Sequence, residues 1–91
     1  MKLKWTSKAH SDLRRLYDFL APVNRPAAIR VVRTLIKAPE QLLEYPRIGE
    51  KLDAFAPKEV RRIFLGAYEI RYQVRAGDIF VLRIWHSRED R

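Results

Sequence analysis

The chain has 91 residues, no cysteine, two histidines and a formal net charge of +8. This length suits one domain, residues 1–91, with one modest core; the composition excludes disulfides and thiolate metal sites and argues against zinc, so no cofactor or metal is indicated. The basic charge favours acidic partners such as nucleic acid or an anionic protein, and the absence of a signal-peptide or membrane-span pattern predicts a cytoplasmic protein.

The first half predicts a strand followed by two helices. Residues 3–6 are short and alternating, which is typical of a strand. Ser7 suits the N-cap of a helix whose apolar residues recur at helical spacing and which should stop near Pro22. Asn24 is the expected N-cap of a second helix, which Pro39 should kink or restart for a further turn. The short connection makes the two helices an antiparallel hairpin.

The second half predicts a loop and then three strands. Residues 45–57 are loop-like, and strands are expected at residues 60–65, 68–75 and 79–85, separated by glycine-containing turns. The middle strand alternates apolar and polar residues, whereas the last is apolar at both parities, as in a strand covered on both sides. The order β-α-α-β-β-β predicts an α+β domain in which a helical hairpin packs on one sheet, its last three strands an antiparallel meander.

The last predicted strand carries one arginine, Arg83, within its apolar run, and the basic residues His86 and Arg88 follow. Such a strand needs no arginine for its stability, so the guanidinium is expected to serve a site or a partner. The structural alternative is an ion pair across the sheet with a carboxylate such as Glu69.

Strand parity decides which of these side chains can meet. In a regular strand Arg83 and Trp85 share one face, and His86 points to the other. The same alternation places Ile79 and Val81 on the face of Arg83. A site shared by Arg83 and His86 would therefore require the strand to end or bulge near Trp85.

Several segments resemble those of a known family when they are taken in order: Trp5-Thr6-Ser7-Lys8-Ala9 with Asp12-Leu13, Leu43-Glu44-Tyr45-Pro46-Arg47-Ile48-Gly49, Val60-Arg61-Arg62, Tyr68-Glu69-Ile70-Arg71-Tyr72-Gln73-Val74, and Leu82-Arg83-Ile84-Trp85-His86-Ser87-Arg88. Over essentially the whole chain, they resemble the ParE/RelE superfamily of small bacterial toxins from type II toxin–antitoxin modules. The resemblance implies two possible activities on one fold, so the fold alone does not decide function. RelE-like members cut messenger RNA on the ribosome, and ParE-like members inhibit DNA gyrase without chemistry of their own. The long hairpin and the Pro-Arg-Ile-Gly segment look more like the ParE branch.

A nuclease would need an acid/base pair and cations for the developing charge. The residues present offer Arg62 (or Arg61) and Arg83 as cations and His86 as general acid or base. A second acid/base group is not evident, because the acidic candidates Glu59, Glu89 and Asp90 stand among arginines that favour ion pairing. RelE-like nucleases often end in a tyrosine near this cluster, and the tail here has none. The sequence therefore favours a non-enzymatic toxin, with the ribosome-dependent nuclease as the alternative.

The candidate target-binding residues are the basic and aromatic side chains of the predicted sheet and tail: Arg61, Arg62, Arg83, Trp85, His86 and Arg88. The resemblance implies a cognate antitoxin, ParD-like or related, that folds across the hairpin and the sheet edge and assembles with the toxin into a heterotetramer or larger species. DNA gyrase is the expected target, and the ribosome with its mRNA is the alternative. A third interpretation is a nucleic-acid-binding module of little toxicity, whose phosphate affinity would fall steeply with salt.

Overall fold

The computed structural model describes residues 1–89 and contains one five-stranded sheet in the order β1-β5-β4-β3-β2. The elements are β1 (Leu3–Trp5), α1 (Ser7–Leu20), α2 (Arg25–Lys37), the 3₁₀ helix η1 (Ala38–Leu43), β2 (Glu50–Lys51), the 3₁₀ helix η2 (Asp53–Phe55), β3 (Glu59–Leu65), β4 (Tyr68–Arg75) and β5 (Asp78–His86). β1 runs parallel to β5, and the other neighbouring strands are antiparallel. The predicted α+β fold, with a helical hairpin and a three-stranded meander, is confirmed. Within the described residues, no helix combines the length and the hydrophobicity needed to cross a membrane.

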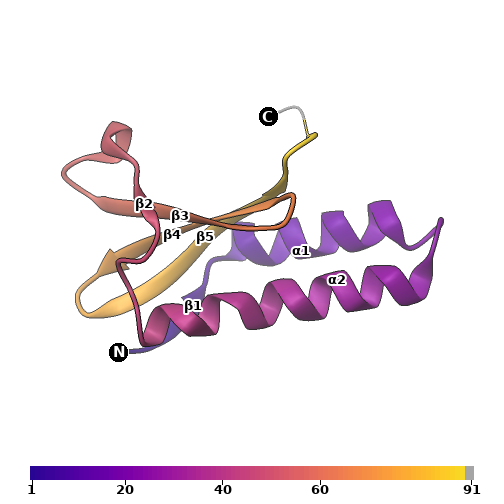
Figure 1. Ribbon diagram of the computed structural model, residues 1–91, viewed down its shortest axis with the longest axis horizontal. Helices are drawn as coiled ribbons and strands as arrows, with labels where there is room; N and C mark the ends of the chain where they lie inside the picture. Colours follow the sequence, from indigo (N-terminus) through magenta and orange to yellow (C-terminus); the bar gives the residue numbers. More distant parts are fainter. Residues whose placement is uncertain (90–91) are drawn as a thin grey trace.

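The two helices begin at side-chain caps. Asn24 accepts a hydrogen bond from the backbone of Ala27 at the start of α2, as the sequence predicted. At α1 the cap is Thr6 rather than Ser7, because the Thr6 hydroxyl oxygen accepts from Ala9 N at 3.1 Å. The hairpin lies against the sheet at one end, and its connecting turn extends well beyond the sheet (Figure 1).

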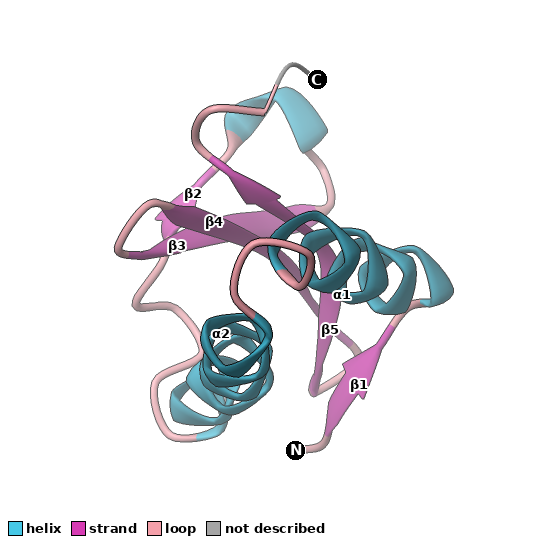
Figure 2. Ribbon diagram, turned by 90° about the vertical axis from the view of Figure 1, so that its right-hand side faces the viewer, coloured by secondary structure: helices cyan, strands magenta, loops and turns pink. Residues whose placement is uncertain are grey.

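The core lies between the helical hairpin and one face of the sheet. Its buried side chains come from both helices and the two adjacent strands: Ala9, Leu13, Leu16, Leu35, Ile70, Val81 and Ile84. Removing each large aliphatic side chain of this kind from water contributes about 1.5–3 kcal/mol. In the view along the helices, α1 lies beside β5 and α2 lies farther along the curved sheet (Figure 2). We call the sheet face away from this core the outer face.

A bulge in β5 decides which side chains reach the outer face. Arg71 of β4 is opposite Arg83, but the next residue, Tyr72, is opposite Val81, so Leu82 is an extra residue in β5. One extra residue shifts the in-and-out alternation by one position.

Because of the bulge, the side chains of β5 do not alternate between the two faces as the sequence predicted. Ile79, Val81 and Ile84 are fully buried against the core. Arg83 therefore points to the opposite face from Ile79 and Val81, and the expectation that they share a face is wrong. Trp85 stays on the face of Arg83, as predicted.

The segment expected to be a loop contains two short elements. β2 is a two-residue edge strand paired with β3, and η2 is a single turn that follows it. Both are too short to produce a periodic signal. Gly49 precedes β2 in a tight position, where a Cβ atom would lie 2.6 Å from the Tyr72 hydroxyl and 2.7 Å from the Arg62 carbonyl oxygen. No larger residue fits there without displacing the backbone of β3.

Candidate functional site

Three arginines stand side by side on the outer face. Arg62 of β3 is opposite Arg71 of β4, and Arg71 is opposite Arg83 of β5. We call these three residues the arginine row. Like charges directly opposite one another destabilise a sheet, so the row has a cost that neighbouring groups must offset.

A different carboxylate accompanies each arginine of the row. Arg83 donates from Nε to Asp12 Oδ2 at 2.8 Å and from a terminal nitrogen to Asp12 Oδ1 at 3.2 Å. Arg71 donates to Glu69 at 3.0 Å, and Arg62 donates to Glu50 at 2.9 Å. Arg83 therefore pairs with a carboxylate, as the structural alternative held, but that carboxylate is Asp12 of α1, while Glu69 accompanies Arg71 and, at 3.8 Å, Arg62.

Aromatic rings lie under the same guanidinium groups. The central carbons of Arg71 and Arg83 lie 4.6 and 4.9 Å from the ring centre of Trp85. Arg71 also lies 5.4 Å from the ring of Phe55, which η2 places over this face, and Arg62 lies 5.2 Å from Phe64. These cation–π contacts hold the guanidinium groups over ring faces.

A second network joins α1 to the C-terminal segment. Asp12, buried with 2% of its surface exposed, also accepts from Arg15 and from the backbone N–H of Ile84 at 2.9 Å. Arg15 binds Glu89 through two nitrogens, at 2.8 and 3.1 Å. The chain of contacts runs Arg83–Asp12–Arg15–Glu89, and we call it the latch.

The latch forms hydrogen bonds with backbone groups of β5 that β1 does not pair. β1 pairs with β5 only as far as Val81, so the rest of that edge has no strand neighbour. Ile84 N–H donates to Asp12, the Ile84 carbonyl accepts from Arg15 at 3.0 Å, and His86 N–H donates to Glu89 at 2.7 Å. Side chains of α1 and of the tail thus replace the missing strand, as buried backbone groups require.

The latch also changes the acidity of its carboxyl groups. Burial alone would raise the pKa of Asp12, but hydrogen bonds from Arg83, Ile84 N–H and Arg15 outweigh it and lower that pKa below 3.8. Burial likewise would raise the pKa of Glu89, but the hydrogen bonds from Arg15 and the His86 backbone N–H, with the charge of Arg15, together lower it. Both groups are held as carboxylates, which suits salt bridges and not proton transfer near neutral pH.

His86 lies on the core side of the sheet, next to α1. Its ring contacts Tyr68 edge-on with centroids 5.0 Å apart, and its Nδ1 accepts from the backbone N–H of Arg88 at 3.1 Å. A groove of about 480 Å³ opens beside it, lined also by Leu16 and Phe19 of α1. Phe19 is 78% exposed, so this groove joins an apolar patch on the helix.

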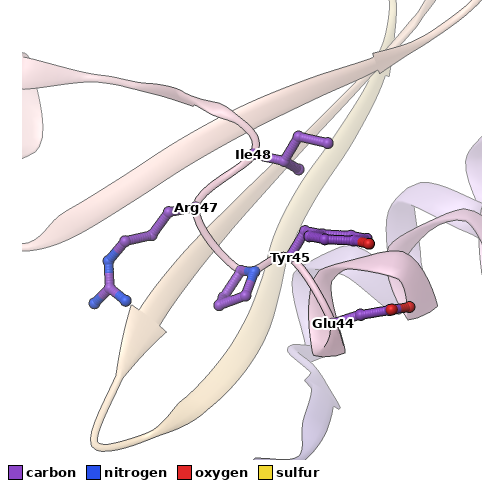
Figure 3. Close-up of a pocket in the computed structure, with 5 residues that line it drawn as sticks. Glu44, Tyr45, Arg47 and Ile48 are labelled. Carbon is purple, nitrogen blue, oxygen red and sulfur yellow. The ribbon is translucent and has the colours of Figure 1, made fainter.

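The Pro-Arg-Ile-Gly loop is fixed to the sheet by Tyr72. The buried Tyr72 hydroxyl donates to the Pro46 carbonyl at 2.8 Å and accepts from Gly49 N–H at 3.1 Å. Burial raises the pKa of Tyr72, so the hydroxyl keeps its proton. The loop lines a shallow pocket of about 440 Å³, with Arg47 pointing to one side and Tyr45 to the other (Figure 3).

Arg61 belongs to this loop and not to the arginine row. It donates to the Gly49 carbonyl at 2.8 Å and to Glu59 at 2.9 Å, and Arg47 binds the same Glu59 carboxylate. Hydrogen bonds from Arg61 and then Arg47 lower the pKa of Glu59. Arg61 therefore has a structural role in fixing this loop to β3.

The residues considered for RNA cleavage are not brought together. Arg62 and Arg83 lie on the outer face, separated by Arg71, whereas His86 lies on the core side beside Tyr68. The bulge at Leu82 precedes Arg83, so it leaves Arg83 and His86 on opposite faces.

The two acidic candidates that the structure describes are both held in ion pairs and offer no free base. Glu59 is bound to Arg61 and Arg47, and Glu89 is bound to Arg15. Asp90 lies outside the described residues. Among the residues that are described, no group of three or more His, Asp or Glu side chains is placed to hold a metal ion.

Sequence reasoning did not identify Asp12, Arg15 and Arg71 as site residues. Asp12 and Arg15 lie on a helix, and their partners are about seventy positions away in the chain, beyond any local spacing rule. The alternation of its strand assigns Arg71 only to a polar face. Its position opposite Arg62 and Arg83 follows only from the strand register, which the bulge alters.

Comparisons with known proteins agree on the type of protein. A family model described as the ParE toxin of the type II toxin–antitoxin system parDE matches residues 3–91. The Caulobacter vibrioides protein named Toxin RelE2 is 32% identical over 83 residues, which are 91% of both proteins. A chain of the chromosomal ParDE system from P. aeruginosa has a TM-score of 0.80 at 28% identity and covers 94% of this chain and 95% of its own. The isolated E. coli RelE toxin shares the fold, with a TM-score of 0.58 at 20% identity, over 97% of this chain and 85% of its own.

Proposed function

Since this chain belongs to the ParE toxin family of type II toxin–antitoxin systems, we propose that it inhibits DNA gyrase through a protein–protein contact and carries out no chemistry itself. The observation that carries the proposal is the separation of the nuclease candidates: His86 lies on the core side, and Arg62 and Arg83 lie on the outer face. RNA cleavage needs acid, base and cations around one phosphate, and this arrangement does not supply them.

The proposed contact surface contains the basic and aromatic residues of the outer face and the tail. Arg62 and Arg83 form its centre, Trp85 supports it from beneath the guanidinium groups with only 8% of its surface exposed, and Arg88 extends it at the exposed C-terminal segment. Arginine and tryptophan are the residues that most often dominate binding energy at protein interfaces. His86 and Arg61 serve this surface indirectly, by fixing the tail and the Pro-Arg-Ile-Gly loop.

The family implies an antitoxin partner, and we propose a ParD-like antitoxin that assembles with this chain into a heterotetramer or larger species. The groove beside Phe19 and the apolar residues at the end of the hairpin offer it a landing surface, since Phe19 and Val23 are 78% and 89% exposed. Exposed apolar patches of this kind mark interaction sites. Because gyrase acts on DNA inside the cell, we expect the chain in the cytoplasm.

The test is gyrase supercoiling measured beside ribosome-dependent RNA cleavage on one folded preparation. Inhibited supercoiling with intact RNA is the expected result. Cut RNA with normal gyrase activity would overturn the proposal. A His86→Ala variant separates the two activities further, because a gyrase inhibitor that uses His86 only to fix the tail should lose much less activity than a nuclease that uses it as acid or base, which should lose about 10²–10⁴ in rate.

The second candidate is a ribosome-dependent endoribonuclease, favoured by the 32% identity to the protein named Toxin RelE2. In that case Arg62, Arg83 and His86 would be the catalytic set, and the ribosome would have to move the tail to unite them. Full toxicity of both His86→Ala and Arg83→Ala as folded proteins would exclude it.

A further inference from the structure

We propose that the arginine row binds carboxylate side chains on an acidic surface of the target protein, and that Arg71 is its central contact. This inference rests on the proposed function for the identity of the target, and it adds the chemistry that is recognised and a residue outside the original candidates.

The arginine row presents three evenly spaced guanidinium groups. Neighbouring strands lie about 4.8 Å apart, so Arg62, Arg71 and Arg83 span about 10 Å across the sheet. Residues three or four apart on a helix have Cβ atoms about 5–6 Å apart. Acidic side chains repeated at that spacing would meet successive arginines of the row.

The guanidinium groups are ordered yet within reach of a partner. The exposed fractions of the Arg71, Arg62 and Arg83 side chains are 22%, 31% and 34%. Contacts with the Trp85 and Phe64 rings hold these groups in place, and guanidinium edges bind carboxylates through paired N–H groups. Ordering before binding lowers the entropy cost of the contact.

Arg71 has one hydrogen-bond donor that no described residue pairs. Its Nε atom is buried and has no hydrogen-bond partner among the described residues. Buried donors without partners are uncommon and need an explanation. Because this atom is buried, a partner carboxylate would reach it by displacing Glu69 or the Phe55 ring, and would then complete the pairing of the side chain.

Carboxylate is a better match than nucleic acid. Single strands bind such faces by stacking bases on aromatic rings. Here arginines already cover Trp85, and Phe80 lies between Lys4 at 5.4 Å and Arg75 at 4.5 Å. The row also already accommodates carboxylates, one beside each arginine.

The test compares Arg71→Gln with a charge-matched control, Arg14→Gln. Arg14 is an exposed residue of α1 that pairs with Asp18, so its substitution removes the same charge away from the outer face. A third variant, Arg71→Lys, keeps the charge and removes the planar fork. Circular dichroism and thermal unfolding verify that each variant is folded.

Affinity measurements for three ligands separate this inference from the proposed function. The ligands are purified gyrase, a short polyglutamate peptide and a single-stranded oligonucleotide of equal charge. We expect Arg71→Gln to weaken both gyrase and peptide binding about ten- to a hundredfold, Arg71→Lys to weaken them less, and Arg14→Gln to leave them near wild type.

The possible results distinguish the role of the arginine row from the proposed inhibition of gyrase. Arg71→Gln and Arg14→Gln with equal affinities for gyrase and peptide would overturn the role of the row and leave gyrase inhibition standing. Loss of peptide binding in Arg71→Gln with no gyrase binding by wild type would keep carboxylate recognition and reject the target. Preferential oligonucleotide binding that depends on Arg71 would replace carboxylate with phosphate and overturn the inference.

Discussion

Asp12 and Arg83, 71 positions apart in the chain, form a two-point contact in which both carboxylate oxygens accept from the guanidinium, at 2.8 and 3.2 Å. Asp12 lies on α1 and Arg83 on β5, so this contact ties the helical hairpin to the outer face. The same carboxylate closes the open edge of β5 at Ile84. One buried side chain therefore serves the stability of the fold and the position of a candidate contact residue.

Replacing Asp12 with asparagine should lower the free energy of unfolding by about 2 kcal/mol, because charged hydrogen bonds to two arginines are lost or weakened. The matched control is Asp18→Asn on the same helix, whose exposed pair with Arg14 should contribute less than about 0.5 kcal/mol. Urea unfolding of the three proteins measures both changes. Equal stabilities of the two variants would contradict the assigned role of Asp12.

Stability should fall in acid because of the latch. Asp12 and Glu89 have folded-state pKa values below their ordinary 3.8 and 4.5, so the stabilisation they provide is complete above about pH 4.5 and is lost as the pH falls through the folded-state values. In Asp12→Asn this acid loss should be smaller. Unfolding free energies measured from neutral pH down to about pH 2.5 test the difference, and parallel profiles for the two proteins would contradict it.

Glu89→Gln should release the C-terminal segment without unfolding the domain. Glu89 accepts from the His86 backbone N–H at 2.7 Å and from Arg15, and a neutral amide holds both more weakly. Hydrogen exchange at the His86 amide should accelerate about tenfold or more, while amides of the core strands keep their protection. Glu44→Gln, at an exposed position, is the control, and the same acceleration in both variants would contradict a specific latch.

Tyr72→Phe should destabilise the protein by about 1–2 kcal/mol, because it leaves the Pro46 carbonyl and the Gly49 N–H without their buried partner. Tyr45→Phe, on the exposed side of the same loop, should change stability by less than about 0.5 kcal/mol. Thermal unfolding compares the two. If gyrase inhibition also falls in Tyr72→Phe at temperatures where it is folded, the loop belongs to the contact surface.

The order of elements could be predicted because periodicity and capping act over short distances. Asn24 begins α2 as expected, and the alternation of β4 places Ile70 and Tyr72 in the core. β2 produced no signal, because a two-residue edge strand has no measurable period. Its pairing with Arg61 and Arg62 depends on the long-range fold.

The site was harder to predict than the fold because it depends on register. Arg83 and Trp85 were identified from their place in an apolar strand, but the partner of Arg83 is Asp12 and not Glu69. The bulge at Leu82 has no marker in the sequence, since leucine is an ordinary strand residue. The opposed positions of His86 and Arg83 nevertheless followed from simple alternation beyond the bulge.

Because Leu82 is the extra residue, the pairing of β5, more than its composition, orients the C-terminal segment. Deleting this one leucine would remove the bulge and leave Arg83 outward and Ile84 inward, because Val81 and Arg83 already face consecutive residues of β4, whereas regular pairing of Leu82 would turn Arg83 toward the core. Relatives should therefore be compared at this point by alignment gaps as well as by residue identity. Aligning a relative that lacks the bulge residue without a gap between residues 80 and 83 would exchange the inward and outward assignments of everything that follows, and with them the apparent binding surface.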